Sequence, residues 1–199
     1  MSEKTDQMKK VEVDLIGLKK SPLYKYRTEN KYFPVIGEGC LNAKIMFVGE
    51  APGRNEAKTG KPFCGAAGKI LNELLASAGI KRPDVYITNI VKDRPQENRD
   101  PTVEEIKIYG TLLDKQIEII KPKAIATLGR YAMVYVMEKF GLKSEIPPIG
   151  QAHGKAHDAK MSYGYIKIIT LYHPCAAIYN RKKLPILTED MQILRKFVG

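Results

Sequence analysis

The chain has 199 residues, enough to bury one substantial core, so we expect a single domain covering residues 1–199. Hydrophobic residues make up 44% and charged residues 28%, which excludes a disordered chain and is typical of a soluble globular protein. Thirty-three Lys and Arg against 22 Asp and Glu leave a formal charge of +11, which suits a polyanion such as nucleic acid but equally fits a merely basic surface.

No apolar run approaches the roughly 20 residues that span a bilayer. The polar N-terminus also lacks the apolar stretch of a signal peptide, so we expect a cytoplasmic protein with no membrane partner. Cys40, Cys64 and Cys175 are odd in number and show no CxxC spacing. They predict neither a disulfide framework nor a metal site, and we expect three buried thiols.

The N-terminal half of the chain alternates helical and strand patterns. Residues 11–20 predict a short helix that leads into an irregular, tyrosine-rich stretch, so that residues 1–34 pack on the domain as an N-terminal segment. Residues 43–48 are a short apolar run closed by Gly and Pro, which predicts a buried strand. Apolar residues at helical spacing predict a helix over 66–78, and residues 84–89 predict a second strand.

The C-terminal half continues the alternation. Thr102 and Glu105 have the spacing of a capping box and predict the start of a long helix. Strands are expected at 123–127 and 165–171, and helices at 130–140 and 187–198. This order predicts a three-layer α/β/α sandwich with a central four-stranded parallel sheet. Ligands of such sheets bind beyond the carboxyl ends of the strands, here in the loops after Val48, Asn89 and Leu171.

Each of those loops opens with polar or glycine-rich sequence. Gly49-Glu-Ala-Pro-Gly53 follows the first strand, and a second glycine-rich turn surrounds Phe63, which lets backbone N–H groups and a ring approach a ligand. Asn89 carries an amide that can read one edge of a nucleobase, and His173 follows the last strand. Taken singly, each has a structural alternative: an ordinary turn, a cap, or a buried histidine.

Together, the motifs of this chain resemble those of family 4 uracil-DNA glycosylases, over about residues 21–190. The motifs are Gly49-Glu-Ala-Pro-Gly53, Gly60-Lys-Pro-Phe63-Cys-Gly65, Ile87-Thr-Asn-Ile-Val-Lys92, Arg94-Pro-Gln-Glu-Asn-Arg99, Leu128-Gly129 and Tyr172-His-Pro174. The resemblance implies an enzyme that hydrolyses the N-glycosidic bond of a deoxyuridine flipped out of DNA, as base-excision repair requires.

The resemblance also implies roles for the loop residues. Phe63 would stack on the flipped uracil, and Asn89 would read its polar edge. His173 would lie beside the base oxygen that gains charge and act as a neutral donor, assisted by backbone N–H groups of the loop from Gly49 to Ala51. The expected catalytic residues are Glu50, Asn89 and His173, and the expected substrate-binding residues also include Gly49, Ala51 and Phe63.

The activation of water is less defined. The best-known branch of the superfamily has an aspartate where this chain and the family 4 pattern have Ala51. Glu50 is then the candidate for orienting water or stabilising the sugar cation, with the alternative that it only ties down its loop. Glu56 would border the C5 side of the base and help to exclude thymine.

Contacts to DNA are expected from two segments. Cations and an amide around the second catalytic strand would hold phosphates: Lys61, Lys92, Arg94, Asn98 and Arg99. After His173, either Ile178 or Tyr179 would enter the duplex as an apolar wedge, with Arg181, Lys182 and Lys183 on the backbone. The alternative for these last cations is a solvated surface turn.

The chain departs from the family at one site. Family 4 members usually hold a [4Fe–4S] cluster on four cysteines, and the matching positions here are Leu18, Ser21, Asp93 and Tyr109. Because such clusters need thiolate ligands, we expect no cluster and no other cofactor. In its place we expect aromatic packing of Tyr24, Tyr26, Tyr32 and Phe33 against the helix that carries Tyr109.

Two other functions stay open. One is a glycosylase of broader specificity that also removes hypoxanthine or xanthine. The other is a non-catalytic DNA-binding protein on the same scaffold, since a fold does not establish a function. The joint presence of Glu50, Phe63, Asn89 and His173 favours the enzyme. We expect a monomer that acts on uracil-containing DNA. A sliding-clamp partner stays open for a repair enzyme, but no motif of the sequence supports one.

Overall fold

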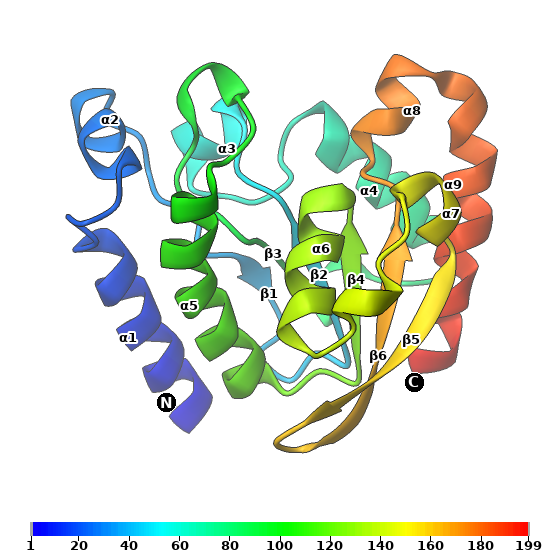
Figure 1. The fold of residues 1–199 in the computed structure, drawn as a ribbon. Helices are drawn as coiled ribbons and strands as arrows, with labels where there is room; N and C mark the ends of the chain where they lie inside the picture. Colours follow the sequence, from blue (N-terminus) through cyan, green and yellow to red (C-terminus); the bar gives the residue numbers. More distant parts are fainter. Residues whose placement is uncertain (1, 199) are drawn as a thin grey trace.

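One sheet forms the centre of the computed structural model, which describes residues 2–198 (Figure 1). Its six strands lie in the order β1-β3-β2-β4-β6-β5. They are β1 (Glu38–Gly39), β2 (Ile45–Gly49), β3 (Tyr86–Asn89), β4 (Ala124–Leu128), β5 (Lys155–Met161) and β6 (Gly164–Leu171). The four inner strands are parallel, as the sequence predicts, and the two edge strands pair antiparallel. The predicted central sheet of four parallel strands is therefore present, and the sequence did not predict the two edge strands that extend it to six.

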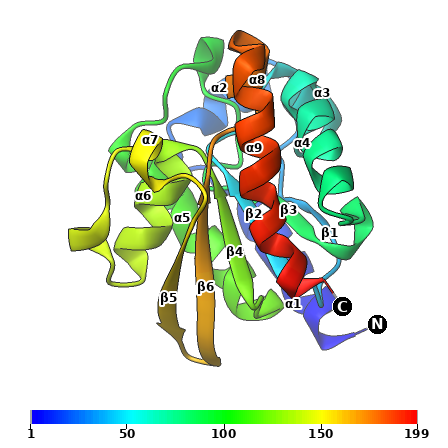
Figure 2. The same ribbon diagram turned by 90° about the vertical axis from the view of Figure 1, so that its right-hand side faces the viewer.

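Helices cover both faces of the sheet, which confirms the sandwich (Figures 1 and 2). They are α1 (Glu3–Ile16), α2 (Leu23–Glu29), α3 (Arg54–Thr59), α4 (Ala66–Ser77), α5 (Val103–Ile120), α6 (Arg130–Lys139), α7 (Ile149–Ala152), α8 (Cys175–Tyr179) and α9 (Leu184–Met191). Helices α1, α5 and α6 pack on one face and α4 and α9 on the other.

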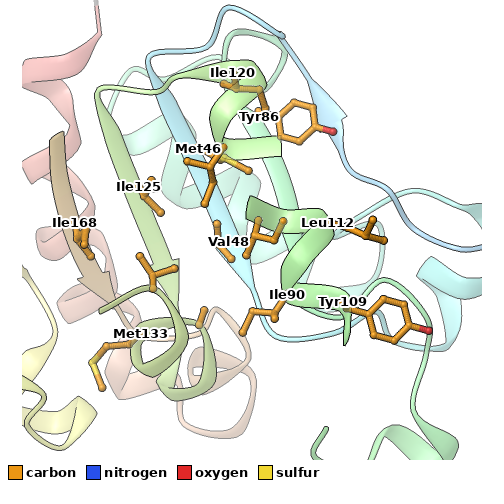
Figure 3. Packing of buried hydrophobic residues seen from close by; sticks show 14 of the residues in the cluster. Met46, Val48, Tyr86, Ile90, Tyr109, Leu112, Ile120, Ile125, Met133 and Ile168 are labelled. Carbon is orange, nitrogen blue, oxygen red and sulfur yellow. The ribbon is translucent and has the colours of Figure 1, made fainter. Parts of the chain in front are cut away.

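Alternating residues of the strands supply two separate hydrophobic cores. In β2, Met46 and Val48 face α5 and α6, whereas Ile45 and Phe47 face α4. Every residue of β2 is buried, as is usual for an inner strand of a parallel sheet covered on both sides. Figure 3 shows the first core, in which Met46 and Val48 of β2, Ile125 of β4 and Ile168 of β6 lie on the face of the sheet that α5 and α6 cover, with Met133 of α6 among their neighbours.

Helix α5 begins where the sequence places it. The Thr102 hydroxyl accepts a hydrogen bond from the Glu105 amide at 3.2 Å, and the Glu105 carboxylate accepts one from the Thr102 amide at 2.8 Å. This reciprocal pair is the predicted capping box. The Arg99 guanidinium also donates to both oxygens of the Glu105 carboxylate, at 2.6 and 2.9 Å, which ties the preceding loop to the helix.

The ends of the chain differ from the prediction. The first helix spans Glu3–Ile16 rather than 11–20. Ser2 caps its start, and Met8, Val11 and Leu15 form its buried apolar stripe. This stripe is narrow and interrupted by polar residues, so the sequence pattern did not reveal it. The stretch expected to be irregular contains α2. The last predicted helix begins earlier, at Leu184, and residues 192–197 continue it as a 3₁₀ turn.

The structure also bears on the expectations about membrane-spanning helices and cysteines. Between residues 2 and 198, the structure has no helix with the length and apolar character needed to cross a membrane. All three cysteines are free, but Cys64 is exposed and Cys40 and Cys175 are half-buried. The prediction of three buried thiols is therefore wrong, because Cys40 and Cys64 lie in loops and Cys175 begins the short helix α8, all of which run along the surface.

Candidate active site

A small pocket of about 180 Å³ lies at the carboxyl ends of β2, β3 and β6. It is lined by Ala51, Gly53, Glu56, Phe63, Ala67, Asn89 and His173. A larger groove of about 470 Å³ shares Ala51, Gly53 and His173 with the pocket, so the two adjoin. The three loops named from the sequence thus meet at one place.

Asn89 ends β3 with its side chain in this pocket. The residue is 1% exposed, and its Oδ1 has no hydrogen-bond partner in residues 2–198. Gly49 is its register partner on β2. A Cβ atom at Gly49 would lie 2.3 Å from Asn89 Oδ1 and 2.8 Å from Phe63 Cζ. Only glycine therefore lets the amide and the ring come this close, and the amide oxygen is left for a ligand donor.

Phe63 forms one wall of the pocket in a constrained loop. Its φ of 48° is in the left-handed region, and its ring centroid lies 5.7 Å from that of His173. The Glu56 carboxylate accepts hydrogen bonds from the amides of Cys64 and Gly65, at 3.0 and 2.9 Å, and so holds this loop at the start of α4. Glu56 thus lines the pocket and anchors it.

His173 is set up as a neutral hydrogen-bond donor. Burial lowers its pKa to about 4, although the nearby Glu56 carboxylate raises it, so the imidazole is uncharged at neutral pH. Its Nδ1 accepts a hydrogen bond from the Cys175 amide at 3.2 Å. The ring proton of the neutral form therefore resides on Nε2, which is free to donate to a ligand. Gly129, with φ of 91°, packs closely on this side chain.

Glu50 lines the larger groove together with His173. Burial, and secondarily the negative charge of Asp100, raise the pKa of Glu50 to about 7, while Arg130 acts in the opposite direction. The carboxyl of Glu50 makes no hydrogen bond or ion pair with the rest of residues 2–198. Its electrostatic interaction with Arg130 is compatible with both readings of Glu50, a group that acts on water or the sugar cation and a group that ties down its loop.

The groove also contains residues that the sequence reasoning did not assign to the site. Arg130 and Tyr131 follow the motif residue Gly129 after β4, and the Tyr131 hydroxyl donates to the Asp100 carboxylate at 2.5 Å. Arg130 lies 3.8 Å from the same carboxylate. The sequence could have pointed to these residues. Ligands bind beyond the carboxyl ends of parallel strands, and the loop after Leu128 follows such an end just as the other three loops do.

The expected wedge is the most exposed apolar feature near the groove. Ile178 is 44% and Tyr179 88% exposed, and Tyr179 also lines the groove. Both belong to the short helix α8 (Figure 1). Arg181 and Lys182 are exposed directly after it. Lys183 lies instead over the Tyr172 ring, 4.2 Å from its centroid. Exposed rings and cations at this rim are compatible with insertion into DNA, and the contact itself stays a prediction.

Among the expected phosphate contacts, the prediction for Lys92 is wrong. Its side chain is fully buried, so it does not reach a phosphate. Arg94 and Arg99 have protein partners: Arg94 donates to the hydroxyl of Tyr32 at 3.1 Å and to Asn98 Oδ1 at 2.8 Å, and Arg99 is bound to Glu105 as described above. These contacts order the loop before α5. Lys61 is exposed, and Asn98 lines the larger groove.

Three of the four positions matched to the cluster ligands are joined by side-chain hydrogen bonds rather than by the aromatic packing that we expected. The Tyr109 hydroxyl donates to the Asp93 carboxylate at 2.6 Å and lies 2.6 Å from the Ser21 hydroxyl. Arg27 Nε lies 3.2 Å from the same carboxylate, and Leu18 packs on the adjoining core. Two hydroxyls, a carboxylate and an aliphatic side chain do not fit a cluster that requires thiolates.

Comparison with known proteins agrees with this geometry. The model of the uracil DNA glycosylase superfamily matches residues 36–195. A type-4 uracil-DNA glycosylase of Sulfurisphaera tokodaii is 43% identical over 192 residues, which cover 96% of this chain and 84% of the relative. Proteins of the same name from Archaeoglobus fulgidus and Saccharolobus solfataricus are 42% and 44% identical, over 94% and 89% of this chain and 88% and 80% of their own lengths. The chain therefore belongs to the uracil DNA glycosylase superfamily, in its type-4 branch.

Proposed function

We propose that this protein is a DNA glycosylase that hydrolyses the bond between uracil and deoxyribose in DNA. The observation that carries the proposal is the buried Oδ1 of Asn89, which has no hydrogen-bond partner among residues 2–198 and lies in a small pocket that Phe63 and His173 also line. A carbonyl oxygen in that position accepts a hydrogen bond from the imino N–H of uracil, and the ring of Phe63 offers a face on which the base stacks. The names of the relatives support the same activity.

The proposed chemistry uses each side chain according to its charge. When the glycosidic bond breaks, the two bonding electrons leave with the base, so uracil becomes an anion and the sugar becomes cation-like. Neutral His173 donates from Nε2 to the base oxygen on which this charge accumulates. Glu50, as a carboxylate in the adjoining groove, stabilises the sugar cation or orients the water that adds to it.

We further infer that the activity does not require an iron–sulfur cluster. The hydrogen-bonded set Ser21, Asp93 and Tyr109 lies at the positions of the ligands, and none of the proposed catalytic residues belongs to it. Iron and acid-labile sulfide analysis of the purified protein tests this inference. A stoichiometric cluster that is needed for excision would contradict it.

The proposal includes uracil-containing DNA as the partner of a monomer, since one chain supplies every residue of the proposed site. The exposed Ile178 and Tyr179 and the cations after them are the proposed contacts to the duplex. Cytoplasmic residence stays a prediction from the sequence.

The test is base release from a labelled oligonucleotide carrying one uracil, beside strands that carry thymine or hypoxanthine. Wild type is compared with Asn89→Ala and His173→Ala, and with Tyr165→Phe, which alters a 75% exposed ring far from the pocket, as a control. We expect uracil release that falls by roughly 10²-fold in both pocket variants and not in the control. Release of hypoxanthine would move the proposal to the broader glycosylase, and binding without any release would leave a DNA-binding protein.

A further inference from the structure

Lys92 is a fully buried lysine directly behind the proposed uracil pocket. Its Nζ donates to the main-chain oxygen of Asn89 at 2.6 Å, to the Thr88 hydroxyl at 2.6 Å and to Gln116 Oε1 at 2.5 Å. Asn89 is the residue whose side chain lines the pocket. The amine of Lys92 is therefore separated from the ligand site by one residue.

The surroundings of this amine consist of acceptors. The Thr88 hydroxyl donates its hydrogen to the Ile36 carbonyl at 2.9 Å, so a lone pair faces Lys92. Gln116 Nε2 donates to the same carbonyl at 2.8 Å, which fixes the amide with Oε1 toward Lys92. The third neighbour is a carbonyl and can only accept. Three acceptors require three hydrogens, and only the ammonium form of a lysine carries three.

This ammonium has no carboxylate partner. Among residues 2–198, no Asp or Glu oxygen lies within ion-pair distance of Lys92, and the neighbouring Asp93 is engaged by Tyr109 and Arg27. Burial lowers the pKa of Lys92 well below its ordinary value. The hydrogen bonds to three acceptors favour the ammonium form and act in the opposite direction. A buried, unpaired charge destabilises a fold, so its presence beside a binding pocket calls for a functional reason.

We propose that Lys92 is a positioning residue for uracil excision, whose ammonium fixes the end of β3 behind Asn89 and holds a positive charge behind the Asn89 wall of the pocket, where it acts on the departing uracil anion through the protein interior. The attraction between unlike charges is screened far less inside the protein than in water. The charge favours the transition state over the ground state, because the base is neutral until the bond begins to break. This inference rests on the proposed glycosylase function.

The first test compares two leaving groups. Lys92→Met keeps an unbranched side chain of similar length and removes the charge. We expect its single-turnover rate on uracil to fall on the order of 10²-fold, as for loss of one anion-stabilising group. On 5-fluorouracil, whose anion is intrinsically more stable, the loss should be smaller, and binding of an uncleavable deoxyuridine analogue in DNA should not change. Lys107→Met, at an exposed lysine of α5, is the control and should match wild type on both substrates.

Equal losses on the two bases, or no loss on either, would overturn the electrostatic role. If Lys92→Met does not fold, the wild-type protein decides by NMR of isotope-labelled lysine, with the Lys92 signal identified by its shift in Thr88→Val. An ammonium signal that persists at neutral pH supports the proposal, and a neutral amine overturns it. Because this spectrum does not depend on catalysis, it separates failure of the proposal from a wild-type protein that releases no uracil.

Discussion

Replacing Tyr109 by phenylalanine removes one hydroxyl from the hydrogen-bonded set of Ser21, Asp93 and Tyr109 and leaves the ring in place. Tyr109 is fully buried, and its hydroxyl joins Ser21 to the Asp93 carboxylate. The bond to the carboxylate contributes about 1.5–3 kcal/mol and the neutral one about 1 kcal/mol. We therefore expect the free energy of unfolding to fall by about 3 kcal/mol, and the melting temperature by roughly 6–12 °C for a domain of this size.

The loss should depend on pH in a definite direction. Burial raises the pKa of Asp93 to about 6, against the opposing hydrogen bond from Tyr109 and the charge of Arg27. A carboxyl whose pKa is higher in the folded state than in the unfolded state stabilises the fold below its ordinary pKa. That contribution is lost as the pH rises through about 6. Tyr109→Phe removes a bond that favours the carboxylate, so its destabilisation should be larger at about pH 8 than at about pH 5.

Urea unfolding followed by circular dichroism at the two pH values measures both effects. Tyr165→Phe is the matched control, since its 75% exposed ring should tolerate the change within about 0.5 kcal/mol. A Tyr109→Phe protein as stable as this control would refute the stabilising role of the set. A loss of equal size at both pH values would refute the assignment of the pH dependence to Asp93.

Three further outcomes are expected. Gly49→Ala should fold but excise uracil on the order of 10²-fold more slowly in single-turnover assays, because the new Cβ displaces Asn89 and Phe63. The control Gly17→Ala, which places its Cβ near no other side chain, should excise uracil at the wild-type rate. The excision rate should rise with pH through about 7 as Glu50 loses its proton, and this rise should be absent in Glu50→Gln. If the rate of Glu50→Gln still rises with pH in this range, another group is responsible for the pH dependence. Tyr179→Ala should slow excision from duplex DNA more than from single strands, and equal slowing on the two substrates would argue against a wedge.

The inner sheet and the pocket were predictable because both follow from local patterns. Short apolar runs gave the four parallel strands, and the loops at their carboxyl ends bring Asn89, Phe63 and His173 to one pocket. Edge strands were not predictable in the same way. Strand β1 has only two residues, and β5 has a mixed, largely polar pattern that is stabilised by pairing with β6 rather than by its own sequence.

The partners of the charged residues were also not predictable from the sequence. A lysine or arginine in a sequence suggests a phosphate contact, but its real partner depends on residues far along the chain. Lys92 is bound by Gln116 of α5, and Arg94 by tyrosines of the N-terminal segment. Because burial of a cation is decided by tertiary packing, no local pattern distinguishes such a residue from a surface one.

The two edge strands of the sheet have a consequence for how this protein behaves at high concentration. An open edge presents unpaired amides and carbonyls on which another molecule can add a strand, which begins aggregation. On one side, β1 is too short to serve as such a template. On the other, the longer β5 exposes Lys155, Asp158 and Lys160, and a second copy that paired there would have to bury these charges. Brevity at one edge and charge at the other thus disfavour growth of the sheet from molecule to molecule.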